Sequence, residues 1–145
     1  IKNYFTYCWY FFLEFIYIFT NRWKKQVGDL EIFSVGMVIM WHSLVTKSYE
    51  ANGWNFSKWK KNKILVPETG VNTMSISEIT HIPRPTVVRK LNYLLKNKYI
   101  SVNKKKLFNV NMQDKTLTDT IKLQEKNVLS LSHLIFKIFG QINIK

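Results

Sequence analysis

The sequence predicts a mainly α-helical fold with one small β-hairpin, and three observations lead to this prediction. Apolar residues recur at helical spacing in long stretches near both ends of the chain. From residue 75 onward the pattern indicates a short helix, a tight turn and a second helix, and two β-prone runs around a lysine-rich turn follow. With 145 residues, 46% of them apolar and 21% charged, the chain can fold around one core, so we expect a single domain.

Residues 2–25 form the first predicted helix, and apolar side chains cover every side of it. One face carries Tyr4, Cys8, Phe11, Phe15 and Ile18, and another carries Phe5, Trp9, Phe12, Ile16 and Phe19. Lys2 and Glu14 limit the charge-free run to about half of the roughly 20 residues that a bilayer span needs, so we expect a buried helix. A helix that is apolar all round must be covered all round, and we expect a second subunit to supply part of that cover.

The second predicted helix covers residues 30–50, with Asp29 as its N-cap and Ala51-Asn52-Gly53 as its end. Its apolar residues make it the expected central core element: Ile32, Phe33, Met37, Ile39, Met40, Trp41 and Leu44. Residues 54–74 are predicted to be irregular. Three aromatic residues, Trp54, Phe56 and Trp59, alternate there with lysines. This pattern is typical of a loop anchored on the core, or of a surface that binds nucleic acid by stacking and charge. We favour the anchored loop.

The clearest local pattern begins at Ser75. Ser75-Ile76-Ser77-Glu78 has the form of a capping box, with Ser75 as N-cap, and predicts a short helix over residues 76–81. Ile82-Pro83-Arg84-Pro85 must turn, and a second helix is expected over residues 85–97. Val87, Leu91 and Leu94 form one buried stripe of that helix, which leaves five residues on its surface: Thr86, Val88, Arg89, Asn92 and Lys96.

A hairpin and a long last helix complete the predicted fold. The strands are expected at residues 99–102 and 107–110, joined by the basic tip Asn103-Lys104-Lys105-Lys106. Residues 117–142 carry a seven-residue repeat with two sets of core positions, one being Ile121, Val128, Ile135 and Ile142 and the other Leu117, Gln124, Leu131 and Ile138. This stripe could pair with a second subunit or pack on the chain's own first helix. We favour a two-subunit helical platform.

The order of these elements is that of a helix-turn-helix followed by a wing, which places its second helix in the major groove of DNA and its basic hairpin along the phosphates or in the adjacent minor groove. Charge supports this interpretation. The chain has 22 basic and 9 acidic residues, a net charge of +13, and residues 58–106 alone carry a net charge of +10. Two of its three arginines, Arg84 and Arg89, stand at the start of the second helix, where a guanidinium can pair with guanine or hold a phosphate.

The stretch Ser-Ile-Ser-Glu-Ile followed by Pro-Arg-Pro-Thr-Val-Val-Arg-Lys-Leu-Asn-Tyr-Leu-Leu-Lys-Asn-Lys-Tyr-Ile resembles the winged helix-turn-helix of bacterial transcription regulators. The length of the chain and its long flanking helices make it similar to the MarR family. That resemblance implies dimers joined through the first and last helices, and it places six residues toward DNA: Arg84, Pro85, Thr86, Val88, Arg89 and Asn92. The family commonly has Gly where Lys98 stands, and we expect Asn97 to form the left-handed turn instead. The wing lacks the family's Asp-x-Arg pattern.

From this we predict a sequence-specific regulator of transcription that binds double-stranded DNA as a homodimer in the cytoplasm. Residues 1–28 and 115–145 would form the dimerisation helices, and residues 29–112 the winged helix-turn-helix core, with the reading module at about 75–110. The predicted DNA-binding residues are Ser75, Arg84, Pro85, Thr86, Val88, Arg89, Asn92, Lys96, Lys104, Lys105 and Lys106. A small-molecule effector could occupy an aromatic-lined gap between the platform and this module.

Two other functions remain open: a winged helix that docks an acidic protein partner, and a basic protein that anchors on a membrane surface through its first helix. An enzyme fits worst, because the sequence has no Gly-rich phosphate loop, no paired carboxylates and no catalytic triad. Its single cysteine, Cys8, excludes an internal disulfide and a thiolate metal cluster, and we expect it to be buried and inert. We expect no cofactor and no metal.

Overall fold

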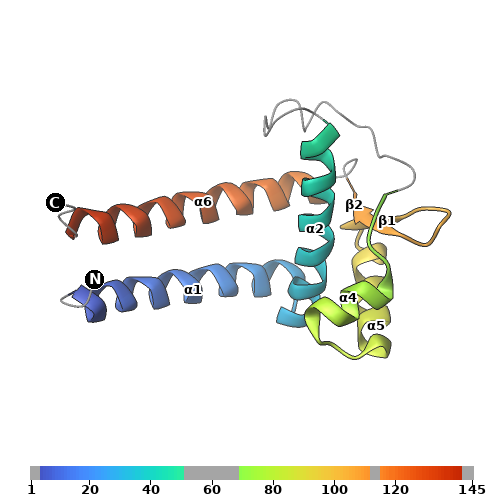
Figure 1. Ribbon diagram of the computed structural model, residues 1–145, viewed down its shortest axis with the longest axis horizontal. Coiled ribbons are helices and arrows are strands. Elements are labelled where there is room, and N and C mark those ends of the chain that lie inside the picture. The colour runs from blue at the N-terminus through green and yellow to red at the C-terminus, as the bar shows by residue number, and fades with distance from the viewer. Residues whose placement is uncertain (1–3, 51–68, 112–114, 142–145) are drawn as a thin grey trace.

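The computed structural model describes residues 4–50, 69–111 and 115–141, and it is mainly helical with one two-stranded antiparallel sheet (Figure 1). The mainly helical fold with a hairpin is therefore confirmed. The elements in chain order are α1 (Phe5–Val27), α2 (Leu30–Glu50), α4 (Thr73–Thr80), α5 (Arg84–Lys96), β1 (Ile100–Val102), β2 (Phe108–Val110) and α6 (Lys115–Gln141). The predicted aromatic and basic loop with Trp54, Phe56 and Trp59 lies outside the described residues.

Helices α1 and α6 lie side by side in opposite directions and project away from the other elements (Figure 1). We call this pair the arm. Arg22 joins the two helices, because its Nη1 donates to the carbonyl oxygen of Lys126 at 3.0 Å and to Ser130 Oγ at 2.8 Å. Closer to the free end, Lys137 Nζ lies 3.8 Å from the Glu14 carboxylate and 4.1 Å from the centre of the Phe11 ring.

Within the single chain, α1 is not covered all round, and the cover expected from a second subunit stays a prediction. Only Trp23 and Val27 of α1 are buried, and Cys8 is half-buried rather than buried. The physical reason is that α6 covers one side of α1, the side with Cys8, Phe11 and Phe15, and leaves the others open. No single helix in the described part of the chain is long and apolar enough to span a membrane. Phe5–Val27 and Leu30–Val45 meet that test only together, across a bend of 93°.

Helix α2 is the hub of the fold, as the sequence predicts, since it contacts α1, α4, α5 and β2. Asp29 is its N-cap, and Asp29 Oδ1 accepts a hydrogen bond from the Ile32 N–H at 2.7 Å, so this prediction is also confirmed. The fully buried side chains around the hub are Val35, Ile39, Ile76, Val87 and Leu94. The prediction that Trp41 belongs to the core is wrong, because 65% of its surface is exposed.

Helix α4 begins three residues earlier than the capping box predicts. Asn72, not Ser75, is the N-cap, and its Oδ1 accepts from the Ser75 N–H at 2.9 Å. The cause is the residue before it: Val71 pairs with Phe108 through two backbone hydrogen bonds, which holds Asn72 in the extended conformation that an N-cap needs. Ser75 is therefore a residue of the first helical turn. The segment predicted to be irregular up to residue 74 ends in this β-bridge and the first residues of α4.

The hairpin follows α5 after a tight helix end. β1 and β2 pair as Ile100 with Val110, Ser101 with Asn109 and Val102 with Phe108, close to the predicted strands. At the end of α5 the left-handed residue is Lys98, with φ of 59°, and the prediction that Asn97 has this role is wrong. The N–H groups of Lys98 and Tyr99 donate to the carbonyls of Leu95 and Leu94, and this pattern of bonds requires a left-handed residue at Lys98.

Candidate nucleic-acid interface

Helix α5 separates its buried and exposed residues sharply. The predicted stripe is confirmed, because Val87, Leu91 and Leu94 are at most 2% exposed. The opposite side carries six of the predicted DNA-binding residues, and all six are exposed: Arg84, Pro85, Val88, Arg89, Asn92 and Lys96. Thr86 is only half-buried. The spacing of three and four residues places these exposed side chains along one face of the helix.

The turn between α4 and α5 fixes where the N-terminus of α5 points. It is only three residues long, from His81 to Pro83. Ser77 Oγ donates to the Ile82 carbonyl at 2.7 Å, and the Pro83 carbonyl accepts from the N–H groups of Thr86 and Val87 at 2.8 and 3.0 Å. Arg84 and Arg89 are thus presented on a helix whose start is tied to α4. Ser75, another predicted site residue, is half-buried in α4, and its N–H is bonded to Asn72.

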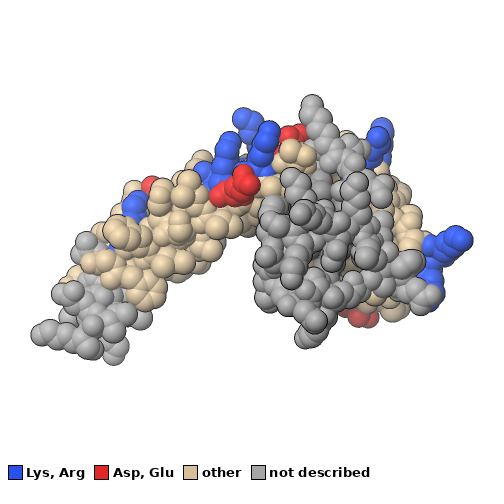
Figure 2. All heavy atoms as spheres, turned by 90° about the horizontal axis from the view of Figure 1, so that it is seen from above, with Lys and Arg blue, Asp and Glu red and all other residues tan. Residues whose placement is uncertain are grey.

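The hairpin tip is a compact turn that exposes Lys104, Lys105 and Lys106. Asn103 organises it: Oδ1 accepts from the N–H groups of Lys105 and Leu107 at 3.0 and 2.9 Å, while its backbone N–H donates to the Leu107 carbonyl. Lysine and arginine side chains project from the end of the molecule that carries the hairpin, away from the free end of the arm (Figure 2). Helix α5 contacts β1, so the helix face and the hairpin pack together. We call α4, α5, β1 and β2 the helix–hairpin unit.

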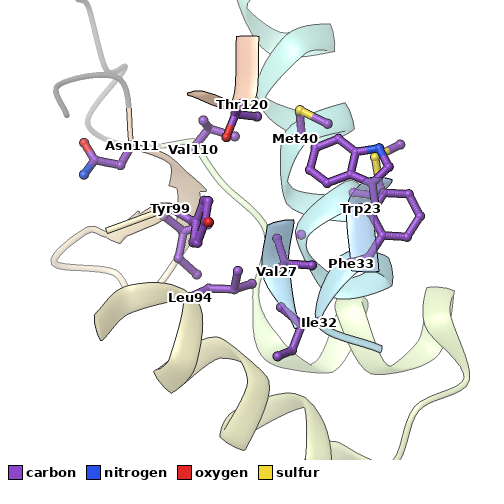
Figure 3. A pocket seen from close by; sticks show the side chains of 13 residues that line it. Trp23, Val27, Ile32, Phe33, Met40, Leu94, Tyr99, Val110, Asn111 and Thr120 are labelled. Carbon is purple, nitrogen blue, oxygen red and sulfur yellow. The ribbon is translucent and has the colours of Figure 1, made fainter. Parts of the chain in front are cut away.

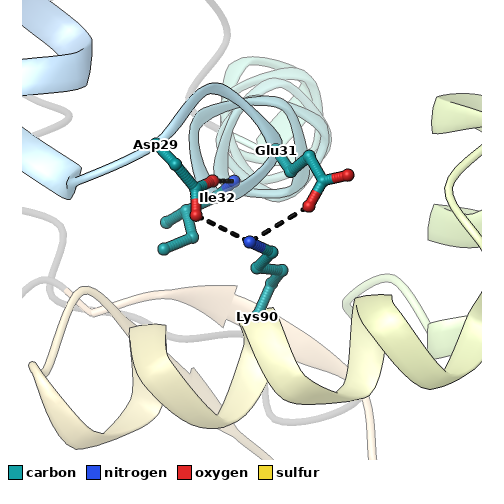
Figure 4. A network of polar contacts seen from close by, with 4 residues as sticks. All are labelled: Asp29, Glu31, Ile32 and Lys90. Atoms are coloured by element: carbon teal, nitrogen blue, oxygen red, sulfur yellow. Dashed lines mark hydrogen bonds and ion pairs between the residues drawn. The ribbon is translucent and has the colours of Figure 1, made fainter.

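Lys90 is a residue that sequence reasoning missed. It stands on the buried side of α5, where its Nζ lies 2.6 Å from Asp29 Oδ2 and 3.0 Å from Glu31 Oε2 (Figure 4). The hydrogen bond to Asp29 raises the pKa of Lys90. Burial opposes this rise, and the hydrogen bond from Lys90 to Glu31 adds to it. Burial would raise the pKa of Asp29, but the hydrogen bonds from Lys90 and the Ile32 N–H outweigh it and lower that pKa.

The signal for Lys90 was present in the sequence. Lys90 follows Val87 by three residues and precedes Leu94 by four, which is the spacing of the buried stripe. A lysine on that stripe requires a carboxylate partner, and Asp29 was already expected at the start of α2. The positive charge of residues 58–106 is therefore less available to an external anion than the count suggests, because one of its twelve cations is paired inside the protein.

A small pocket of about 60 Å³, open to solvent, lies where the arm meets the helix–hairpin unit (Figure 3). Its walls come from α1, α2, α5, the hairpin and α6, and they include Trp23, Phe33, Met40, Leu94 and Tyr99. The aromatic-lined gap expected from the sequence is thus present in the structure. Its apolar walls suit an apolar ligand, and an effector in it stays a prediction.

Neither grouped metal ligands in the described residues nor comparisons with known proteins point to a function. Within residues 4–50, 69–111 and 115–141, no three His, Cys, Asp or Glu side chains are grouped so that they could hold a metal ion. No family model, no curated protein and no solved structure matches the chain. The resemblance to MarR regulators therefore stays a sequence-based prediction, and function has to be argued from the exposed side of α5, the hairpin tip and the arm.

Proposed function

We propose that the protein is a sequence-specific regulator of transcription that binds double-stranded DNA as a homodimer, with the helix–hairpin unit as a winged helix-turn-helix. The observation that carries the proposal is the exposed face of α5. It combines Arg84 and Arg89 near the helix start with Asn92 and Lys96 further along, and the opposite face of the same helix is buried. A rigid helix with forked donors on one face is what the major groove admits and recognises.

Each residue of this face has a distinct expected contact. Arg84 and Arg89 can donate two parallel hydrogen bonds to guanine, and Asn92 can pair with adenine. Val88, which is 43% exposed, can contact a thymine methyl group. Thr86, Ser75 and Lys96 suit the phosphates, and the three lysines of the hairpin tip suit phosphates or the adjacent minor groove. The compact turn around Asn103 supports this use of the tip, because the backbone that carries the lysines needs little further ordering on binding.

The arm supports the homodimer. The heptad positions Val128, Leu131 and Ile135 of α6 are 64%, 40% and 47% exposed, while its buried residues are Asn127 and Leu134. Ile121, Gln124 and Ile138 of the same stripe are half-buried, so the chain's own helices cover only part of it, and a second copy can pack on the open part. A two-fold dimer would place two α5 helices on half-sites about one helical turn, roughly 10 bp, apart.

Fluorescence anisotropy tests the proposal. The purified protein is titrated with a pool of genomic duplexes and with a random duplex over a salt series. We expect tight, sequence-dependent binding at physiological salt, and weaker specific binding by about tenfold or more for Arg84→Ala and for Arg89→Ala. Lys25→Ala, an exposed cation at the end of α1, is the matched control and should keep the sequence preference. Weak binding that is equal for all duplexes and disappears with salt would contradict the proposal.

A second candidate, docking of an acidic protein partner, has one observation in its favour. Met74 and Ile79 of α4 are 57% and 53% exposed, so apolar side chains lie exposed on the helix that packs beside the basic α5. Such a mixture is common in protein interfaces. If duplex binding at low salt is lost while the protein stays folded and dimeric, this candidate becomes the better one. Stable dimers without detergent, and no sedimentation with anionic vesicles, would count against a membrane-surface role for the arm.

A further inference from the structure

Asp29 stands at the junction between the arm and the helix–hairpin unit, and both of its carboxylate oxygens are used. Oδ1 accepts from the Ile32 N–H and caps α2, while Oδ2 accepts from Lys90 on α5 (Figure 4). Asp29 directly follows Gly28, the residue where α1 ends and the chain turns with φ of 99°. One side chain therefore connects the end of α1, the start of α2 and the middle of α5.

This contact differs in kind from the rest of the packing between α2 and α5. Val87, Leu91 and Leu94 hold α5 in place by apolar contacts, which depend little on direction. The ion pairs of Lys90 at 2.6 and 3.0 Å depend strongly on distance and angle, and the lysine side chain is only 11% exposed. A small rotation of α5 about the core would preserve most apolar contact but would break these bonds.

We propose that Lys90 is a positioning residue that sets the orientation of α5 relative to the arm, and through it the half-site spacing that the dimer accepts. This inference rests on the proposed function. In a two-fold dimer joined through the arms, the same rotation of α5 occurs in both subunits. Both rotations then contribute to the change in separation of the two reading helices. Lys90 points away from the exposed face of α5, and its effect on DNA is therefore indirect.

The test uses the full-length protein and two readouts. An operator half-site is first selected with the unaltered protein from random duplexes, and binding is then measured to palindromes with half-site centres about 9, 10, 11 and 12 bp apart. We expect Lys90→Met to reduce the preference for the best spacing by about fivefold or more. Lys90→Arg, which retains a cation within reach of both carboxylates, should preserve it. Lys25→Met is the matched control on an exposed lysine.

Salt dependence separates positioning from a direct phosphate contact. Loss of one phosphate contact lowers the slope of log Kd against log salt by about 0.9, and we expect no such change for Lys90→Met. A lower slope, or equal loss of affinity at every spacing, would overturn the proposal. So would a spacing preference that Lys90→Met leaves intact.

The second readout does not need DNA. Spin labels on Asn92→Cys in α5 and Ser132→Cys in α6, in a Cys8→Ser background, report the distance between the reading helix and the arm. We expect the distance distribution to broaden in Lys90→Met and to stay narrow in Lys90→Arg. If the protein selects no DNA sequence, the proposed function fails, while this distribution still decides whether Lys90 orients α5. If Lys90→Met does not fold, Asp29→Asn replaces it, because asparagine can still cap α2 but removes the charge.

Discussion

The helix–hairpin unit buries its large apolar residues in the core, whereas the arm leaves many of its own exposed. In the unit, Ile76, Val87 and Ile100 are at most 4% exposed and pack on α2. In the arm, large side chains lie open: Phe5 and Tyr17 are 58% and 70% exposed, and Phe136 is 79% exposed. Since burial of apolar surface is the main driving force of folding, the unit is held by the core that it shares with α2, whereas the arm has an uncovered surface that a partner would cover.

Exposed aromatic side chains form a continuous row on the open side of α1. Phe5, Trp9 and Phe12 stack along one face, with ring centres 6.0 and 5.5 Å apart. Contiguous exposed apolar surface of this kind is typical of an interface rather than of a monomer in water. The difference between the two regions can be tested by substitutions that act on one and spare the other.

The largest effect is expected from a charge on the open stripe of α6. Ile135→Glu should weaken the proposed dimer by about 100-fold or more, because a two-fold interface would bury the new carboxylate twice without a partner. Analytical ultracentrifugation measures the dimer dissociation constant, and circular dichroism shows whether the helices remain. His133→Glu, an exposed change two residues away and off the stripe, is the control. Equal dimer stability in both variants would mean that this stripe is not the interface.

The next largest effect concerns the close contact between Gly70 and the hairpin. A Cβ at Gly70 would lie 2.8 Å from Leu107 Cβ and from Asn109 Nδ2, and the residue has φ of 145°. We expect Gly70→Ala to lower the free energy of unfolding by about 2 to 3 kcal/mol. Urea denaturation measures it.

Gly140 in the arm gives the opposite expectation. Nothing lies within 4 Å of a Cβ there, and the residue is in the last turns of α6. Gly140→Ala should stabilise the helix by up to about 0.5 kcal/mol, because alanine is a better helix former. If both substitutions changed stability in the same direction, the contrast between a closed unit and an open arm would be wrong at these positions.

A smaller effect is expected at the end of α5. Lys98 occupies the left-handed conformation that glycine adopts without strain. Lys98→Gly should therefore raise the free energy of unfolding by about 1 kcal/mol, since the steric cost removed exceeds the extra chain entropy of glycine. Asn97→Gly, at a residue with φ of −88°, should destabilise instead. Comparison of the two variants by thermal unfolding shows which of the two residues adopts the left-handed conformation.

The smallest expected effect is the pH dependence of the Asp29 contact. The folded pKa of Asp29 lies below its ordinary value of 3.8, so the contact stabilises the fold fully above that value. The contribution is lost as the pH falls from about 4 through the folded pKa. Melting temperatures of the unaltered protein and of Asp29→Asn should therefore differ at pH 7 and converge as the pH falls below 3.8 and through the folded pKa. A difference that stays constant over this range would show that the charge of Asp29 contributes nothing.

Local patterns in the sequence predicted the elements well where neighbouring residues decide the outcome. The stripe of Val87, Leu91 and Leu94, the N-cap at Asp29 and the hairpin around the lysine tip all follow from spacing and turn chemistry. The error at Ser75 occurs because a distant partner competes with the local signal. Ser75 has the residue type of an N-cap, but pairing of Val71 with Phe108, 37 positions away in the chain (108 minus 71), moves the cap to Asn72.

The sequence by itself determined that the chain has three long helices with apolar faces, a short helix joined by a tight turn to a second one, and a basic hairpin, because each depends on periodicity or on a few adjacent residues. Only the tertiary structure decided which apolar stripe of each long helix is used inside the chain and which is left open. It also brought Lys90, to which the sequence analysis gave no role, into contact with Asp29. The physical reason is that periodicity defines the faces of a helix, whereas the packing of other elements decides what covers each face.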